Sequence, residues 1–479
     1  MKVAIVHYHL QPGGVTRVIE NTLRSWAESG NDIDAVTLAG RPYPGSEIKR
    51  VGLVEGLDYC DTAEAIDAKV LAERLVTAAK QTLGGMPDLW HVHNHSLGKN
   101  PALTGAIACL AEEGHPILLH PHDFAEDGRP ENFKSLREVY DRTYPVAPRI
   151  HYAALNKRDH TFLEKLVSGT ESQVHLLANA IPENQAFQAE DTCPKGIPSD
   201  LYLYPVRAVR RKNLGEMSLL AAAYPDRYFA NSLEPTNPAF RPQFERWKSF
   251  SRELQLPVTF GLGHQVDCSF HIMVAFSEAI VTTSVAEGFG LGFLEPWVFG
   301  KSLCGRNLPE ITGDFTDHQI DLTNLYERLE VDLALLSQPS ELRPRIASVL
   351  SKFFLDYGVE EPAGSLQIAY DSLVRNNRVD FGRLDEGLQE ELILAATCSG
   401  EIRKSIRSQA KIERLDSSLI EKNAGSVCKR FSLSTYGTKL AGIYQDLLKA
   451  TPGKIEFVDG ANLLGEFLSP SRLNLLRTT

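Results

Sequence analysis

The chain has 479 residues with 50 basic and 61 acidic side chains, and its formal net charge is −11. Its 43% hydrophobic content, with 35 glycines and 26 prolines, is typical of a globular protein of about two to four domains and excludes collagen, coiled-coil and long disordered chains. The acidic balance argues against a nucleic-acid partner, because affinity for phosphate polymers comes mainly from lysine and arginine. A small anion held in a local basic pocket stays compatible with this charge.

The cysteine pattern and the hydropathy of the sequence indicate in which cellular compartment the protein is expected. The seven cysteines are scattered without a C-x-x-C pair, which is typical of reduced thiols in a cytoplasm. The apolar run Val3–Val6 is too short for a signal peptide, and no later stretch reaches the roughly eighteen uninterrupted apolar residues of a membrane span. We therefore expect a cytoplasmic protein without stable membrane insertion. A peripheral membrane contact stays open, and the oligomeric state is not predicted.

Apolar strand-like runs alternate with helix-like periodicity through residue 305. Val3–Val6 is typical of a buried parallel strand, and apolar residues then recur from Val15 to Trp26 at the spacing of one helix face. Further strands are expected at 33–38, 89–92, 117–119, 150–155 and 174–177, and, after the stretch Cys193–Pro198, at 201–206, 228–230, 258–260, 279–283 and 302–304. This alternation predicts an α/β protein with two Rossmann-like domains, 1–190 and 195–430.

The C-terminal third has a different pattern. From about 320 to 425 the chain is charged and mostly helical, with no strong strand signal. An apolar stripe from Tyr436 to Leu448 predicts a helix that Pro452-Gly453 ends. The final segment to Thr479 has no clear periodic pattern.

Two loops after predicted strands have the chemistry of a phosphate site. Gly13-Gly14 precede a helix, whose free N–H groups attract an anion that glycine lets approach closely. The run from Arg207 to Lys212 carries four cations in six residues after the strand 201–206, where open α/β sheets bind ligands. A diphosphate fits there, with Arg207 as a bidentate clamp and Lys212 as a point charge. The alternatives are a simple tight turn and a solvated charged loop.

The segment Glu287-Gly-Phe-Gly-Leu-Gly-Phe-Leu-Glu295-Pro296 follows the strand 279–283. Pro296 favours a helix that starts near Phe293 or Leu294, so the glycines form a loop whose N–H groups are able to bind phosphate. A carboxylate is repelled by a diphosphate, so Glu287 and Glu295 are expected to accept hydrogen bonds from sugar hydroxyls. The segment is not G-x-G-x-x-G, which disfavours a dinucleotide site. Two acids at a helix start are the structural alternative.

Histidines follow two N-terminal strands. His120-Pro-His122-Asp123 follow the strand 117–119, and His91, His93 and His95 alternate, which predicts a shared face. Imidazole is a common metal ligand, but the alternating trio lacks an acid or thiolate partner in the sequence. We therefore predict polar positions that line a cleft, and no metal site.

In combination, these motifs resemble the retaining GT-B glycosyltransferases of family 4, which include sucrose-phosphate synthases and bacterial mannosyl- and glucosyltransferases. Four motifs of the family match in order, and Asn179-Ala-Ile181 is similar to the segment that leads into the family's interdomain linker. The matches are Gly13-Gly14, His122-Asp123, the pair Arg207 and Lys212, and the pair Glu287 and Glu295 with Gly288-Phe289-Gly290 between them. The resemblance covers most of residues 1–315 and resumes at Phe431-Ser432, which resembles the start of the family's last helices. It therefore implies that residues 431–479 form C-terminal helices that pack back across the domains. The long separation of Glu295 and Phe431 implies a helical insertion, at about 320–425, in the C-terminal domain.

The resemblance implies a GT-B fold with an acceptor domain, 1–190, and a nucleotide-sugar domain, 195–430. It implies that Arg207 and Lys212 stabilise the leaving nucleotide diphosphate, that Glu287 binds the donor hexose and that His122 lies at the hexose or its reacting centre. Donor-binding positions are then Gly13, Gly14, Gly288, Phe289, Gly290, Leu291 and Glu295. Retention in such enzymes is described as front-face attack in which the donor phosphate takes the acceptor proton. We therefore expect metal-independent hexosyl transfer without a cofactor.

The acceptor is expected to bind at the rim of the N-terminal domain. The candidate residues are His93, Asn94, His95, Lys99, Asp123 and the loop 124–129. Their histidines and acids favour a small polyhydroxylated acceptor, namely a sugar, sugar phosphate, polyol or glycerate, over a lipid. The donor base, the hexose, the acceptor and the linkage are not predicted.

Other proteins with two facing Rossmann-like domains are alternatives. An epimerase and a phosphorylase share the architecture, although the chain offers no context for a pyridoxal phosphate lysine. A non-catalytic protein that binds a nucleotide sugar uses the same residues as the enzyme. An NAD oxidoreductase is disfavoured because the glycine fingerprint is missing.

Overall fold

The protein is described by a computed structural model of residues 1–182 and 193–478. The described chain forms two compact units. The first comprises 1–182, 356–359 and 429–469, and the second comprises 193–355, 360–428 and 470–478. The expected domain boundary near residue 190 lies outside the described residues.

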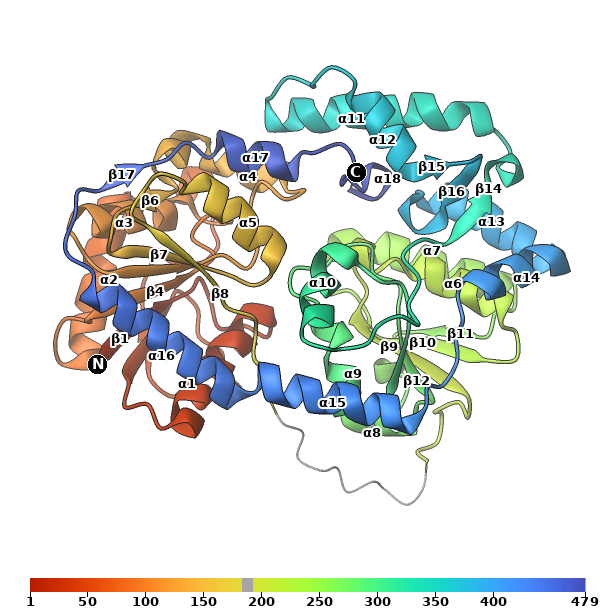
Figure 1. The fold of residues 1–479 in the computed structure, drawn as a ribbon, viewed down its shortest axis with the longest axis horizontal. Helices are drawn as coiled ribbons and strands as arrows, with labels where there is room; N and C mark the ends of the chain where they lie inside the picture. The colour runs from red at the N-terminus through yellow and green to blue at the C-terminus, as the bar shows by residue number, and fades with distance from the viewer. Residues whose placement is uncertain (183–192, 479) are drawn as a thin grey trace. The chain divides into compact units, whose positions relative to one another are not determined.

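A parallel seven-stranded sheet is the centre of the first unit, with the strand order β3-β2-β1-β4-β5-β7-β8 (Figure 1). Its strands are β1 (Lys2–Val6), β2 (Asp34–Ala39), β3 (Val51–Leu53), β4 (Leu89–His93), β5 (Ile117–His120), β7 (Ile150–Ala154) and β8 (Gln173–Leu176). Six of these match the expected strands. Only three residues long, β3 carries too short a pattern to be predicted.

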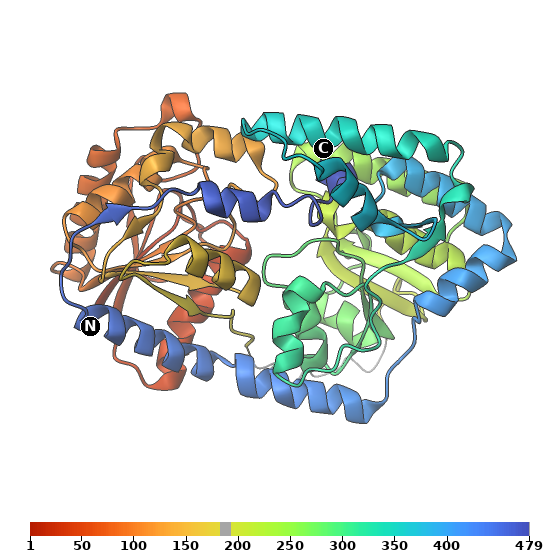
Figure 2. The same ribbon diagram turned by 45° about the horizontal axis from the view of Figure 1, so that its top comes forward.

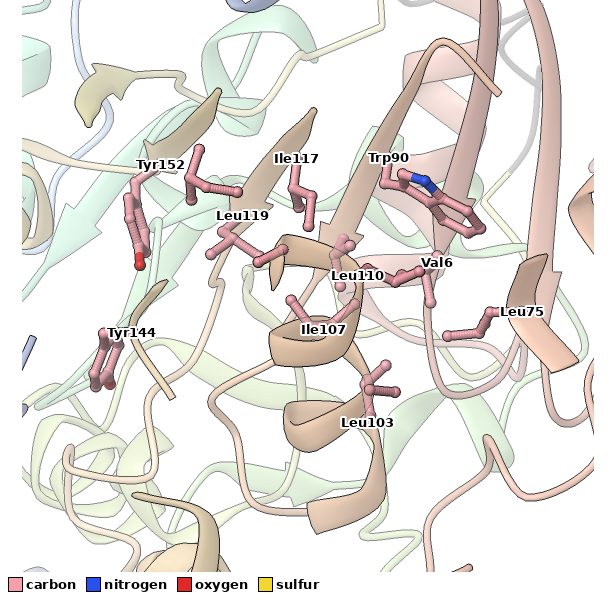
Figure 3. Packing of buried hydrophobic residues seen from close by; sticks show 14 of the residues in the cluster. Val6, Leu75, Trp90, Leu103, Ile107, Leu110, Ile117, Leu119, Tyr144 and Tyr152 are labelled. Atoms are coloured by element: carbon pink, nitrogen blue, oxygen red, sulfur yellow. The ribbon is translucent and has the colours of Figure 1, made fainter. Parts of the chain in front are cut away.

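Helices cover both faces of this sheet. On one face lie α2 (Ala68–Leu83), α3 (Pro101–Glu112), α5 (Lys157–Leu166) and α17 (Ala461–Phe467), and on the other lie α1 (Gly14–Ser29) and α16 (Leu433–Lys449). Figure 3 shows Leu103, Ile107 and Leu110 of α3 against the strand residues Trp90 and Leu119. Fully buried strands of this kind read as continuous apolar runs, which is why they were predictable.

The expected C-terminal helix is α16, whose apolar stripe packs against the sheet and α1. Buried positions include Tyr436, Leu440 and Tyr444. The two helices approach closely, since a Cβ on Gly437 would lie 2.5 Å from the Ser25 carbonyl oxygen. Residues 429–469 thus belong to the first unit, while 470–478 belong to the second.

The second unit has a parallel five-stranded sheet in the order β11-β10-β9-β12-β13. The strands are β9 (Leu201–Arg207), β10 (Tyr228–Leu233), β11 (Val258–Phe260), β12 (Ala279–Thr282) and β13 (Ser302–Gly305), all at expected positions. Its helices include α6 (Leu214–Ala223), α7 (Arg241–Glu253), α8 (Phe270–Phe276), α9 (Glu295–Val298) and α10 (Pro309–Asp317). Neighbouring β9 and β12 bring the two predicted phosphate loops to one edge of this sheet.

The segment from 320 to 428 is mostly helical, as expected, but it also contains short strands that the sequence did not predict. A small antiparallel sheet, β14 (Glu330–Asp332), β16 (Arg378–Asp380) and β15 (Val374–Arg375), accompanies the helices (Figure 2). The helices are α11 (Leu342–Tyr357), α12 (Ser365–Leu373), α13 (Glu386–Cys398), α14 (Gly400–Gln409) and α15 (Ser417–Phe431). Strands of two or three residues, each with a single valine among charged residues, are too short to show a period. No helix in the described part of the chain is long and apolar enough to cross a membrane.

Candidate functional site

The carboxyl ends of β9 and β12 bring Lys212 and Glu287 together. After β9, a 3₁₀ turn (Arg210–Lys212) leads into α6, and the loop after β12 carries Glu287. The Lys212 ammonium forms an ion pair with Glu287 Oε1, and Arg211 Nη1 lies 3.2 Å from Oε2. Ser284 Oγ also donates to Glu287 Oε1 at 2.6 Å. One carboxylate therefore holds two cations at the sheet edge where α/β proteins bind ligands.

Hydrogen bonds to the backbone fix the two loops against each other. Val285 N donates to the Arg211 carbonyl at 2.9 Å. Thr283 Oγ1 lies 3.0 Å from the Lys212 carbonyl and 3.1 Å from that of Asn213. Because backbone and hydroxyl contacts set the turn, Lys212 and Glu287 are positioned before any ligand arrives.

The electrostatics of the pair favour its charged form. Burial alone would raise the pKa of Glu287, but Lys212, Arg211 and the Ser284 hydroxyl outweigh it and lower that pKa to about 2. Burial lowers the pKa of Lys212, and the Glu287 carboxylate opposes this shift. The Lys212 side chain is 15% exposed and that of Glu287 12%. With two cations for one carboxylate, the centre has an excess positive charge and suits an anion.

The four cations between 207 and 212 point to different partners. Arg207 is exposed, and its Nη1 donates to the Glu234 carbonyl at 3.3 Å. Arg210 pairs with Glu386 of α13 at 3.0 Å. The contacts at Glu287 thus come from Lys212 and from Arg211, which the sequence did not single out. Arg211 stands in a run of basic residues, and the sequence does not show which of them faces Glu287, because the 3₁₀ turn sets the side-chain directions.

Beyond Glu287, the predicted glycine loop leads to α9. Gly290 adopts a left-handed conformation, φ 88°, and a Cβ there would lie 3.0 Å from Ile311 and Phe293 side-chain atoms. Phe289 is buried, while Gly288 and Leu291 are partly exposed. The helix begins at Glu295, slightly later than expected, because residues 291–293 form a separate 3₁₀ turn. Glu295 is the partly buried first residue of α9.

In the first unit, Gly13 is the N-cap of α1 and Gly14 its first residue. Both are exposed, and a Cβ on Gly14 would meet no atom within 4 Å. The start of this helix is therefore exposed, and its role in binding a donor stays a prediction.

A left-handed residue, Asn94, organises the predicted His-Asp turn. Its φ is 58°, and its Oδ1 accepts from the backbone N–H groups of His122 at 2.6 Å and Asp123 at 3.1 Å. His122 is 7% exposed, and its Nε2 lies 2.8 Å from His93 Nδ1. Asp123 forms an ion pair with Arg129.

The expectation that His93, Asn94 and His95 line an acceptor rim is not supported, because each is at most 2% exposed. The rings of His91 and His93 lie side by side, tilted by 31° with centroids 4.4 Å apart, but the shared face predicted for His95 was wrong. The strand β4 ends at His93, and the left-handed Asn94 turns His95 toward the Thr143 carbonyl, 3.1 Å away. Their polar groups thus support the fold from within the core.

Lys99, another predicted acceptor residue, lies beside Tyr59 at the surface. Lys99 is exposed, and its Nζ lies 5.9 Å from the centroid of the Tyr59 ring. Tyr59 is itself 43% exposed and contacts His9, with ring centroids 4.7 Å apart. Sequence reasoning did not find Tyr59, since a single aromatic residue in a loop carries no pattern.

A group of histidines in the first unit resembles a metal centre in composition. Ring nitrogens of His91, His93 and His120 lie within 4.8 Å of one another, and all three side chains are fully buried. Burial lowers the pKa of His91 to about 3, so it stays neutral, as a ligand must. However, His91 contacts the Tyr444 hydroxyl at 2.7 Å and His120 at 3.0 Å. Both ring nitrogens of His91 are engaged by these contacts, so we interpret the group as a hydrogen-bonded network.

Comparison with known proteins adds to this geometry. No protein-family model matches the chain. It is 26% identical over 512 aligned positions to the mannosylglucosyl-3-phosphoglycerate synthase of Petrotoga mobilis, with 98% of each chain covered.

Solved structures share the fold at low sequence identity. HepE from Anabaena in complex with UDP matches with a TM-score of 0.54 and 12% identity, covering 93% of this chain and all of that one. A glycosyltransferase from Rickettsia africae matches with a TM-score of 0.52 and 13% identity, covering 94% and 99%. The two parallel-sheet units and these matches show that the chain has the GT-B glycosyltransferase fold.

Proposed function

We propose that the protein is a retaining glycosyltransferase that moves a hexose from a nucleotide-diphosphate sugar to a small hydroxylated acceptor. The observation that carries the proposal is the Lys212–Glu287–Arg211 centre at the carboxyl ends of β9 and β12. The similarity of the whole chain to a sugar-phosphoglycerate synthase supports the reaction class.

In the proposed reaction, Lys212 and Arg211 stabilise the negative charge that develops on the departing diphosphate. Lys212 exchanges its ion pair with Glu287 for a phosphate oxygen, and the released carboxylate accepts hydrogen bonds from hexose hydroxyls. A preorganised contact of this kind lowers the activation barrier by about 3 to 4 kcal/mol, which accelerates the reaction about a hundred- to thousandfold. Exposed Arg207 would reach the diphosphate from the end of the same strand.

Other residues have supporting roles in this proposal. Backbone N–H groups of Gly14 and of Phe289-Gly290 bind phosphate, and Glu295 binds the ribose. His122 lies at the hexose. The donor phosphate takes the acceptor proton, so no enzymic nucleophile is needed, and the cations replace a bridging metal. We therefore propose that the reaction is metal-independent and that the protein is a glycosyltransferase of family 4.

The acceptor is proposed to carry a glycerate or phosphate group. The similar Petrotoga protein is named for a phosphoglycerate product. In this chain, exposed Lys99 beside Tyr59 offers a cation and a hydroxyl to such an anion. Lys99 is therefore proposed to bind the acceptor, while the buried His93, Asn94 and His95 take no direct part in it.

Nucleotide binding tests the first half of the proposal. UDP, GDP and ADP are each added in a thermal-shift assay, where a ligand at a hundred times its Kd stabilises by about 2.7 kcal/mol. Incubating the hexose conjugate of the stabilising nucleotide with sugar phosphates, polyols and phosphoglycerates then tests transfer. Nucleotide release only with acceptor present supports the enzyme. Binding without release favours the alternative, a non-catalytic or epimerase-type protein.

Substitutions test the site. Lys212→Ala and Glu287→Ala are each expected to abolish turnover without unfolding the protein. Lys248→Ala, on α7 of the same unit, is the matched control and is expected to keep wild-type turnover. Wild-type activity in both site variants would remove the assignment.

A further inference from the structure

We propose that residues 470–478 and α13 fix the turn that carries Lys212, which makes Arg477 and Gln389 positioning residues of the nucleotide-sugar site. The inference rests on the proposed function and assigns a role to the insertion that the sequence left without one. All the contacts that carry it lie within the second unit.

The Arg477 side chain holds the turn by a hydrogen bond to the backbone of Arg210. Its side chain is 2% exposed, and Nη2 donates to the Arg210 carbonyl at 2.7 Å. Its Nη1 lies 3.1 Å from Gln389 Oε1 and 3.1 Å from Glu386 Oε1. In return, Arg210 Nη2 donates to the Leu476 carbonyl at 3.3 Å. A single guanidinium therefore joins the turn to α13 with fixed geometry.

Gln389 holds the residue that ends the turn. It is fully buried, and its Nε2 donates to Asn213 Oδ1 at 2.9 Å and to the Phe381 carbonyl at 3.0 Å. Asn213 has φ 53°, a left-handed conformation that surrounding contacts must maintain in a residue other than glycine. Since Asn213 follows Lys212 directly, Gln389 helps to set the direction of the Lys212 side chain.

The same segment also contacts the second loop of the site. Asn474 Nδ2 donates to the Val285 carbonyl at 3.1 Å, two residues before Glu287. Val285 N in turn donates to the Arg211 carbonyl. Residues 474–477 therefore touch both loops whose side chains meet in the Lys212–Glu287 pair.

These contacts stabilise an arrangement that charge repulsion opposes. Arg210, Arg211 and Lys212 are consecutive cations, and the turn must send the first toward Glu386 and the other two toward Glu287. Without Arg477, the Arg210 carbonyl keeps only the Asn213 N–H as a donor among the described residues, and Glu386 loses one of its two arginines. Lys212 then samples other directions, so donor binding weakens. Arg477 itself is buried, so we assign it a positioning role.

The test compares Arg477→Lys, Arg477→Ala and Asn474→Ala with Arg328→Ala as matched control. Arg328 also donates to backbone carbonyls, those of Ser372 and Leu373, but within the insertion and away from the turn. We expect Arg477→Ala to raise the Kd of the nucleotide by about tenfold, the equivalent of one hydrogen-bonded anchor. Arg477→Lys, which keeps the charge without the fork, should give an intermediate value.

Steady-state kinetics separate positioning from general destabilisation. KM for the nucleotide sugar should rise in the Arg477 variants, while KM for the acceptor stays at the wild-type value. Arg328→Ala should lower the unfolding temperature and leave both constants unchanged.

Folded variants that bind nucleotide as tightly as the wild type would overturn the inference. If Arg477→Ala fails to fold, the test uses Asn474→Ala, which removes one hydrogen bond of a partly exposed side chain. An unchanged nucleotide Kd in that variant overturns the inference. A wild-type protein that binds none of the three nucleotides overturns the proposed function instead.

Discussion

Replacing Glu287 with glutamine tests the charge logic of the site. The substitution keeps the shape of the side chain and removes the carboxylate that Lys212 and Arg211 share. The pKa of Glu287 is lowered from 4.5 to about 2, and a shift of this size corresponds to about 3 kcal/mol of stability. Because the side chain is only 12% exposed, solvent screening removes little of this energy.

The sign of the pH dependence follows from the lowered pKa. The stabilisation is fully present above the unfolded-state pKa of 4.5 and is lost as the pH falls toward 2. At pH 7, Glu287→Gln should therefore unfold at a lower urea concentration than the wild type, by an amount equivalent to about 3 kcal/mol. The difference should shrink below pH 4.5.

Glu287→Gln should lower the stability of the protein without weakening nucleotide binding. In Glu287→Gln, Lys212 and Arg211 have lost their carboxylate, so a nucleoside diphosphate should bind at least as tightly as in the wild type. Turnover should still collapse, because the hexose hydroxyls have lost their acceptor. Glu310→Gln is the matched control, since Glu310 pairs with Arg472 at the surface and its removal should cost under about 1 kcal/mol. Wild-type stability at pH 7, or a nucleotide Kd raised tenfold, would refute this reasoning.

Two further predictions concern other buried charged residues, and a third concerns the expected independence of a metal ion. Arg306→Met should lower the free energy of unfolding by about 3 to 5 kcal/mol in urea, because it leaves Glu216 and Asp380 buried without their partner; a loss under 1 kcal/mol would contradict it. Burial raises the pKa of Glu126 from 4.5 to about 7, so wild-type stability should fall by about 3 kcal/mol from pH 4.5 to above pH 7, and Glu126→Gln should remove that slope in urea titrations at several pH values. Hexosyl transfer should continue at its normal rate in EDTA; loss of transfer that Mg²⁺ restores would disprove the metal-independent mechanism.

The strands were predictable because their signal is local. The strands β1 and β9 are buried on both faces, so their sequences are continuous apolar runs bounded by polar residues. The three-stranded sheet at 330–380 was missed because Arg378 and Asp380 look like solvated charges, whereas Asp380 is buried against Arg306. Long-range pairing of this kind leaves no local pattern.

For the site, sequence order predicted the strand ends but not the side-chain directions. The loops after β9 and β12 were expected to bind one ligand, and the parallel pairing of these strands places them at one sheet edge. Arg477 lies 267 positions from Arg210 in sequence, so no spacing rule connects them. For His95, the alternation failed because one residue, Asn94, left the strand conformation.

The basic run 207–212 shows why neither simple reading of a charge cluster was sufficient. A solvated loop would leave its cations exposed, and a diphosphate clamp would aim them at one point. Instead, Arg210 is 21% exposed and bound to Glu386, while Lys212 is 15% exposed and bound to Glu287. Half-exposed Arg211 lies beside Glu287, and Arg207 stays at the surface. One cation therefore anchors the turn to the rest of the unit, and the others are proposed to bind an anion. Acids and carbonyls of distant segments impose this division.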